Sequence, residues 1–293
     1  MPQDLLQRMV LGSANFGNKY GLANNHYLLD SGKVSSILQT AADAGISLID
    51  TAPSYGQSEI VIGSIGSQSF RMISKIPWID VTNESVSERV RSIVTGSLKN
   101  LCTDNLHAIL LHRPEQLFTN EGGEIFAELC SMKEQGLTKY IGCSVYDVPE
   151  LEKLIEKYKF DIIQLPLNVI DQRFLISGWI DQLAASEIQV HARSIFLQGL
   201  LLLSGDAQPN WLHEKDTALK EWRQFLFQSG YSPVEKCLEF VLGVKNISGI
   251  LVGVDSAEHL NQIIDLTSNY RPLKSFDPSE LNDLLIDPRR WPQ

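Results

Sequence analysis

The sequence predicts an α/β fold, a single (β/α)8 TIM barrel. Eight short apolar runs recur along the 293 residues, and stretches with helical periodicity separate them. The runs lack polar alternation, as expected for parallel strands that are buried on both faces. No linker rich in proline, glycine or charge divides the chain, and no G-x-G-x-x-G motif follows the first run. These last two observations favour a closed barrel over a doubly wound sheet.

The predicted strands follow one another along the chain. They span Met9 to Ser13, Ile46 to Asp50, Arg71 to Lys75, Leu106 to His112, Lys139 to Ser144, Asp161 to Leu165, Ile188 to Ser194 and Ile247 to Gly253. Helical segments between them include Val34 to Ala44 and Ser85 to Leu101. Thr82, Asn83 or Ser85 is the expected N-cap of the second helix. Glu88 is then the capping-box partner, three residues beyond Ser85.

We treat residues 1–293 as one domain with a single long connection. That connection is an extended loop region around residues 204–232, which follows the seventh strand and is therefore expected at the catalytic face. It contains Trp211, Trp222 and Phe225. These aromatic residues either wall a pocket or form the core face of a helix, and we favour the core.

Composition and charge narrow the classes of partner. The formal net charge is −10, so the surface repels phosphate backbones and anionic lipids, and we expect no nucleic-acid and no membrane partner. An anionic ligand requires a local basic pocket. The start of the chain lacks the apolar run of a signal peptide. The four cysteines show no C-x-x-C spacing, which predicts a cytoplasmic protein without a metal site.

Polar residues collect at the ends of three neighbouring predicted strands. Asp50, Lys75 and His112 end the second, third and fourth strands, and Tyr55 follows Asp50 by five residues. In a barrel these strand ends converge on one mouth, where catalytic groups reside. A lysine cation lowers the pKa of a nearby phenol, an aspartate orients the lysine, and a histidine shares proton transfer. Each residue also has an ordinary structural role available, as a turn cap, rim aromatic, solvated cation or core histidine.

With these residues in place, the sequence resembles the aldo-keto reductase family. The matching segments are LGSANFG, GISLIDTAPSYGQSE, ISK, SLKNLCTDNLHAILLHRPE, KYIGCSVYD, QLPLN, ARSIFLQGLL and ILVGVDSAEHL. The resemblance implies an NAD(P)H-dependent oxidoreductase acting on an aldehyde, ketone or sugar carbonyl, or on an alcohol. It also implies that Tyr55 is the general acid, that Lys75 lowers its pKa, that Asp50 pairs with Lys75, and that His112 orients the substrate carbonyl.

The resemblance also implies a cofactor site across the mouth of the barrel. Ser144 and Gln164 match positions that hydrogen-bond the nicotinamide carboxamide. Ser13 and Ala14 match a pair that lines the cofactor. The backbone from Ser194 through Phe196 to Gln198 matches the loop under the pyrophosphate.

The sequence departs from the family pattern at three places. Val145 stands where an asparagine is frequent, and Arg193 stands where an aromatic ring commonly stacks on the nicotinamide. In the segment expected at the adenosine end Gly253 is kept, but Asp255 and His259 replace the usual residues. Because a 2′-phosphate favours Arg or Lys contacts, these changes leave the choice between NADP(H) and NAD(H) unresolved and predict weaker discrimination for NADPH over NADH than the family usually shows.

Two other functions fit parts of the pattern. A barrel glycoside hydrolase needs two carboxylates about 5 to 10 Å apart, and no second carboxylate accompanies Asp50 at the strand ends. A cofactor-binding sensor or regulatory subunit with little turnover is the second alternative, and the presence of all four catalytic residues weighs against it.

Overall fold

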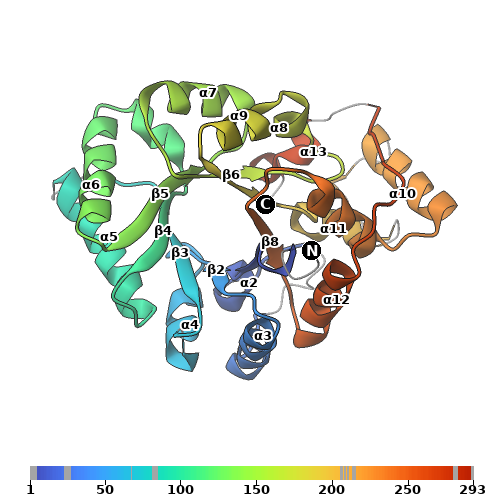
Figure 1. The fold of residues 1–293 in the computed structure, drawn as a ribbon, viewed down its shortest axis with the longest axis horizontal. Coiled ribbons are helices and arrows are strands. Elements are labelled where there is room, and N and C mark those ends of the chain that lie inside the picture. The colour runs from blue at the N-terminus through green and yellow to red at the C-terminus, as the bar shows by residue number, and fades with distance from the viewer. Residues whose placement is uncertain are drawn as a thin grey trace.

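Eight parallel strands close into a barrel in chain order, β1 through β8, with helices around it (Figure 1). The computed structural model describes residues 5–22, 28–66, 68–80, 85–204, 207, 209, 211–212, 216–279 and 283–291. The predicted (β/α)8 barrel is confirmed. The division into one domain over residues 1–293 stays a prediction.

All eight predicted strands are present, with ends that shift by up to two residues. The strands are β1 Met9–Gly12, β2 Leu48–Asp50, β3 Arg71–Ile76, β4 Leu106–Leu111, β5 Thr138–Ser144, β6 Ile162–Pro166, β7 Gln189–Arg193 and β8 Gly249–Gly253. The α-helices are α2 Ala14–Gly17, α3 Ser31–Asp43, α4 Ser58–Ile65, α5 Val86–Asn100, α6 Gly122–Glu134, α7 Val148–Lys157, α8 Arg173–Ile176, α9 Trp179–Ala185, α10 Thr217–Ser229, α11 Pro233–Gly243, α12 Ala257–Ser268 and α13 Asp283–Ile286. Short 3-10 turns are η1 Pro114–Phe118, η2 Leu197–Leu202 and η4 Pro288–Arg290.

The sequence signal at the start of α5 is confirmed. Ser85 is the N-cap and accepts from the backbone N–H of Glu88, whose side chain binds the Ser85 backbone in return. This capping box satisfies two backbone donors that the first turn of a helix leaves without partners. The alternative caps Thr82 and Asn83 lie outside the described residues.

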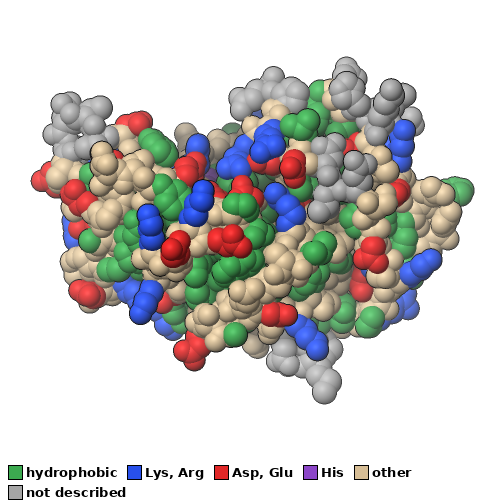
Figure 2. All heavy atoms as spheres, turned by 90° about the horizontal axis from the view of Figure 1, so that it is seen from above, with side chains coloured by type: hydrophobic (Ala, Val, Ile, Leu, Met, Phe, Trp, Pro, Cys, Tyr) green, Lys and Arg blue, Asp and Glu red, His purple; other side chains and the backbone are tan. Residues whose placement is uncertain are grey.

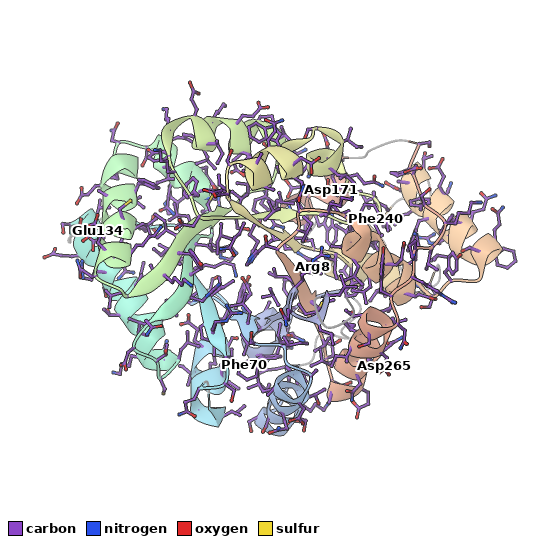
Figure 3. All side chains as sticks on the ribbon, viewed as in Figure 1. Arg8, Phe70, Glu134, Asp171, Phe240 and Asp265 are labelled. Carbon is purple, nitrogen blue, oxygen red and sulfur yellow. The ribbon has the colours of Figure 1, made fainter. Side chains whose placement is uncertain are left out.

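Side chains fill the barrel and the layer between strands and helices (Figure 3). The larger core lies between the strands and the surrounding helices. A smaller cluster fills the barrel interior, and its buried members are Val10, Leu48, Ile73, Ala108, Leu110 and Ile162. Gly249 is required in β8 because a Cβ there would lie 2.7 Å from the ring of His191. Strand β8 thus leaves room for an imidazole inside the barrel.

The long connection after β7 contains α10 and adds a second core. Trp222 of α10 is 1% exposed and packs against Phe225 and Phe276. Its indole N–H donates to Leu201 O at 3.1 Å. The core interpretation is therefore confirmed for Trp222. Phe225 and Trp211 pack partly buried against the same core, and Trp211 does so from a turn and not from a helix.

Acidic and basic side chains are interspersed over the face drawn in Figure 2. No helix in the described part of the chain is long and apolar enough to cross a bilayer.

Candidate active site

Strand periodicity places the functional side chains at one mouth of the barrel. Leu48, Ile73 and Leu110 face the interior, and successive side chains of a strand alternate between its two faces. Residues two positions further along therefore face the interior at the carboxyl end of each strand. They are Asp50, Lys75 and His112.

A buried ion pair forms the base of this site. Lys75, which is 1% exposed, pairs with Oδ1 of Asp50 and donates to Thr51 O at 3.0 Å. Gln164 Nε2 donates to the other carboxylate oxygen of Asp50 at 2.9 Å. The third contact of Lys75 Nζ is the Tyr55 hydroxyl, at 3.3 Å. Both charges are thus neutralised by each other, and the ammonium is directed at the phenol.

The turn between β2 and α4 brings Tyr55 to the lysine. The backbone of Tyr55 closes two turns, donating to Ala52 O at 3.0 Å and accepting from Ser58 N at 3.1 Å. Gly17 of α2 lies against this turn so closely that a Cβ would stand 2.0 Å from Tyr55 O. The glycine is therefore required for α2 to pack on the segment that carries the phenol.

The pKa of Tyr55 differs from the sequence-based expectation. Burial raises the pKa of Tyr55, the Asp50 carboxylate raises it further, and Arg193 opposes both. We expected Lys75 to lower this pKa, but the lysine charge is largely cancelled by Asp50. The phenol is therefore held protonated across the physiological range, which suits a proton donor.

His112 is neutral at physiological pH. Burial, and after it the positive charges of Lys75 and Arg193, lower the pKa of His112 to about 3. Its Nδ1 lies 3.2 Å from Ser54 Oγ, and its ring meets that of Tyr55 edge-on with centroids 5.7 Å apart. Nε2 makes no hydrogen bond with any residue that the structure describes, so it is available to a ligand.

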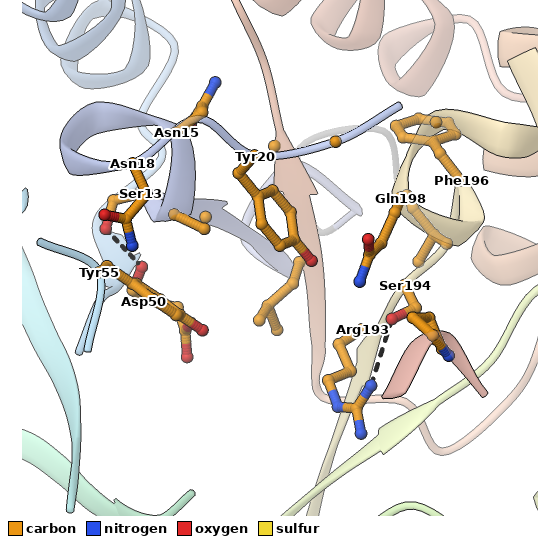
Figure 4. A pocket seen from close by; sticks show the side chains of 18 of the residues that line it. Ser13, Asn15, Asn18, Tyr20, Asp50, Tyr55, Arg193, Ser194, Phe196 and Gln198 are labelled. Carbon is orange, nitrogen blue, oxygen red and sulfur yellow. Dashed lines mark hydrogen bonds between the residues drawn. The ribbon is translucent and has the colours of Figure 1, made fainter. Parts of the chain in front are cut away.

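A cavity of about 550 Å³ opens over these groups. Most of the residues predicted for catalysis or cofactor binding line it, several of which Figure 4 labels: Ser13, Ala14, Asp50, Tyr55, His112, Ser144, Gln164, Arg193, Ser194, Phe196, Gln198, Gly253 and Asp255. Lys75 does not line it, since it lies buried between Asp50 and Tyr55. His259 does not line it either, because its side chain is exposed on the first turn of α12.

Arg193 of β7 lines the cavity and makes hydrogen bonds to the end of β5 and to the loop after β7. Its Nε donates to Ser144 Oγ at 3.1 Å, and its two terminal nitrogens donate to Val145 O at 2.9 Å and Ser194 Oγ at 3.2 Å. Its guanidinium also lies 4.2 Å from the ring centroid of Tyr146. Among the described residues no carboxylate forms an ion pair with Arg193, so its charge is held in place by neutral groups.

The loop after β7 carries backbone strain. Ser194, Leu197 and Gln198 have φ of 56°, 47° and 53°, in the left-handed region that non-glycine residues rarely adopt. Strain of this kind persists where the surroundings enforce it, and it clusters at ligand sites. The loop lies where the sequence analysis expects the pyrophosphate.

The opposite end of the cavity contains a carboxylate and an unsatisfied amide. Asn15 Nδ2 donates to Val254 O at 2.6 Å and to Asp255 Oδ1 at 2.9 Å. Its buried Oδ1 has no hydrogen-bond partner among the described residues. A buried polar atom without a partner is costly, and this oxygen belongs to a residue that lines the cavity.

Comparison with known proteins decides the family. The sequence matches the aldo/keto reductase family profile over residues 8–285. The chain belongs to the aldo/keto reductase family. It is therefore an NAD(P)H-dependent oxidoreductase that acts on carbonyl groups.

Individual relatives of this aldo/keto reductase are distant. It is 24% identical to the NADH-specific methylglyoxal reductase of Escherichia coli over 88% of both chains. It is 30% identical to methylglyoxal reductase DkgB of Salmonella typhi, over 50% of this chain and 56% of that protein. Among solved structures, an aldo-keto reductase of Bacillus halodurans in its holo form superposes with a TM-score of 0.74 at 16% identity, covering 96% and 95% of the chains. Because this identity is low, the likeness to the Bacillus halodurans structure concerns the fold alone.

The cavity of this aldo/keto reductase fits a nicotinamide cofactor. Donors and acceptors for a carboxamide lie at Ser144 and Gln164, and the strained loop from Ser194 to Gln198 lies along the same cavity. Asn15, whose buried Oδ1 has no partner among the described residues, lines the cavity as well.

Sequence reasoning missed several residues that line the cavity. They are Asn15, Asn18, Tyr20, Ser54, Tyr146 and Arg289. The rule that strand ends carry function points to Tyr146, two residues beyond the end of β5. Tyr20 and Ser54 lie in loops after β1 and β2, where the same rule applies more loosely. Nothing in the sequence points to Arg289, which lies beyond the segments that resemble the family.

Proposed function

We propose that this enzyme reduces small carbonyl compounds, 2-oxoaldehydes among them, with Tyr55 as the proton donor and NADH as the reductant. The observation that carries the proposal is the contact of the Tyr55 hydroxyl with the buried Lys75 Nζ, while Tyr55 and a neutral His112 line the same cavity. A protonated phenol next to a charge-compensated lysine has the properties of a general acid.

The side chains divide the work of reduction. A nicotinamide cofactor held along this cavity would supply the hydride for the carbonyl carbon. His112 donates a hydrogen bond from its neutral ring to the carbonyl oxygen and so orients the substrate. Tyr55 transfers its phenolic proton to that oxygen as negative charge develops there. The resulting phenolate is stabilised by Lys75, which Asp50 and Thr51 O hold in place.

The cofactor and the substrate class are inferred from charge and from relatives. Asp255 lines the cavity, and no Lys or Arg from β8 or α12 lines it among the described residues. A 2′-phosphate near Asp255 would be repelled, which favours NADH. Relatives named as methylglyoxal reductases, one of them NADH-specific, support both inferences.

The proposal is tested by following oxidation of NADH and NADPH with methylglyoxal. Tyr55→Phe should keep NADH binding and lose turnover by about 10²- to 10⁴-fold, the usual contribution of general acid catalysis. Tyr20→Phe is the matched control, because Tyr20 is another phenol that lines the cavity. The loss of turnover in Tyr20→Phe should be much smaller than in Tyr55→Phe. Near wild-type turnover in Tyr55→Phe refutes the assignment. NADH binding with no turnover of any aldehyde would favour the sensor alternative.

A further inference from the structure

An arginine from the C-terminal end of the chain reaches the cavity. Pro288 and Arg289 of η4 line it together with Tyr146, which follows β5. The Arg289 guanidinium lies 3.6 Å from the ring centroid of Tyr146, while that of Arg193 lies 4.2 Å from the same centroid. Two guanidinium groups thus contact one aromatic ring at the edge of the active site.

Arg289 is held along one edge only. Its Nε and Nη2 bind the Asp287 carboxylate at 2.9 and 2.8 Å. Its Nη1 makes no hydrogen bond with any residue in the described part of the chain, and its side chain is 37% exposed. The guanidinium is therefore fixed in orientation by the carboxylate and the ring, with one pair of donors left for a ligand.

The charge of the cavity is unevenly distributed. Arg193 and Arg289 are the cationic side chains that line it among the described residues, and the lining carboxylates are Asp50 and Asp255. Asp50 is neutralised by Lys75, and Asp255 lies at the other end beside Asn15. Because Arg289 is paired with Asp287, the uncompensated positive charge on the wall around Tyr146 is that of Arg193, in a chain whose formal net charge is −10. A positive wall of this kind attracts an anion and is unfavourable without one.

We propose that Arg289, supported by Tyr146 and the charge of Arg193, binds an oxyanion group of the substrate. The inference rests on the proposed carbonyl reduction and adds to it a preference, among the substrates, for aldehydes or ketones that carry a carboxylate or a phosphate. The carbonyl lies at Tyr55 and His112, and the oxyanion lies against Nη1 of Arg289.

The test compares two aldehydes that differ in charge, para-carboxybenzaldehyde and para-carbamoylbenzaldehyde, as substrates with NADH. Wild-type enzyme should favour the carboxylate in kcat/KM by about 10- to 100-fold, the range of a charge-assisted hydrogen bond. In Arg289→Gln this preference should vanish, because KM rises much more for the carboxylate than for the amide. The matched control is Arg290→Gln, because Arg290 also contacts Asp287, at 3.6 Å, but does not line the cavity.

A second pair, glyceraldehyde phosphate and glyceraldehyde, distinguishes a phosphate from a carboxylate as the preferred group. Equal kcat/KM for the charged and neutral members of both pairs in the wild type overturns the proposal. So does an Arg289→Gln enzyme that loses activity equally with charged and neutral aldehydes, because that result would assign Arg289 to the cofactor.

Binding of terephthalate, measured by calorimetry, tests the subsite without turnover. Weaker binding to Arg289→Gln than to wild type and Arg290→Gln supports the subsite whether or not either aldehyde is reduced. Failure of the proposed function shows separately, as absence of turnover with methylglyoxal and with every other aldehyde. Equal affinity in all three proteins overturns the subsite.

Discussion

The two sides of the cavity handle charge in opposite ways. On the β2–β4 side the carboxylate of Asp50 and the ammonium of Lys75 cancel, and His112 is neutral. On the β5–β7 side Arg193 and Arg289 surround Tyr146. Arg289 is paired with Asp287, whereas Arg193 has no ion-pair partner among the described residues. A proton donor works best where its environment keeps it protonated until reaction, whereas a bound anion needs standing positive charge. The difference suggests that one side moves the proton and the other side holds the charges of the ligands.

The largest effect is expected when the ion pair of Asp50 and Lys75 on the β2–β4 side is disrupted. Lys75→Met leaves a buried Asp50 carboxylate without its partner, which typically costs about 3–5 kcal/mol of stability. The same change should raise the pKa of Tyr55, because the carboxylate charge is no longer balanced. Asp50→Asn should lower that pKa, because the charge of Lys75 is then unopposed. We expect the alkaline limbs of the kcat/KM profiles for carbonyl reduction to move in opposite directions, because Tyr55 must be protonated to donate. If neither profile moves, the pair has only a structural role.

A second effect concerns His191, a buried histidine of β7 that is uncharged at neutral pH. Burial first, then His107 and Lys75, lower the pKa of His191 to about 3 from its ordinary 6.5. Below pH 6.5 this histidine binds a proton in the unfolded chain. In the folded chain it stays unprotonated until the pH falls to about 3. Stability should therefore fall as the pH drops through this window, by about 1.4 kcal/mol per pH unit for this group. Urea unfolding of His191→Leu between pH 7 and 5 should show a correspondingly shallower dependence. An unchanged slope would mean that His191 is protonated in the folded protein.

A smaller effect distinguishes the role of Arg193 from that of Arg289. Arg193 occupies the position expected against the nicotinamide, and a fixed cation within a few Å disfavours the oxidised ring, which is positive, relative to the reduced ring, which is neutral. Arg193→Tyr should therefore lower the ratio of the oxidised to the reduced cofactor's Kd by about tenfold. Arg289→Gln is the matched comparison and should leave the ratio near that of the wild type. Fluorescence titration measures both constants, and an equal ratio in all three proteins would remove the electrostatic role of Arg193.

The smallest effect concerns Asp255. NADPH should not be preferred over NADH by more than about 100-fold, equal to about 2.7 kcal/mol. Asp255→Asn should improve binding of NADPH a few-fold, because the Asp255 carboxylate no longer repels the 2′-phosphate. Binding of NADH, which lacks this phosphate, should change little. A stronger preference for NADPH in the wild type would point to another phosphate site. The first candidates are Arg271 and Lys274, which are exposed and do not line the cavity.

The barrel and the reacting groups could be predicted because both follow from local patterns. Buried strands read as apolar runs, and a period of two fixes which strand-end residues face the interior, so Asp50, Lys75 and His112 could be grouped before any coordinates. Neither the direction of the Tyr55 pKa shift nor the contacts of Arg193 was predictable. The first depends on how far burial outweighs a compensated lysine, and the second on the distance between β5 and β7.

Arg289 illustrates a different limit. Its place in the cavity depends on how the chain returns across the barrel mouth after α12, about 140 residues after Tyr146 in the sequence. No periodicity in the sequence encodes such a contact. His259 shows the reverse, since a residue of the expected segment has its side chain exposed on α12.

The central claim is that Tyr55 stays a protonated phenol until it donates, and its ionisation can be measured directly. Tyrosine labelled with ¹³C at Cζ gives one resonance for each phenol, and comparison with Tyr55→Phe assigns the resonance of Tyr55. We predict that this resonance keeps the chemical shift of a neutral phenol through the pH at which exposed tyrosines ionise, because burial and Asp50 raise its pKa. In Asp50→Asn its ionisation should move to lower pH. A Tyr55 resonance that titrates near neutral pH in the wild-type protein would contradict the account.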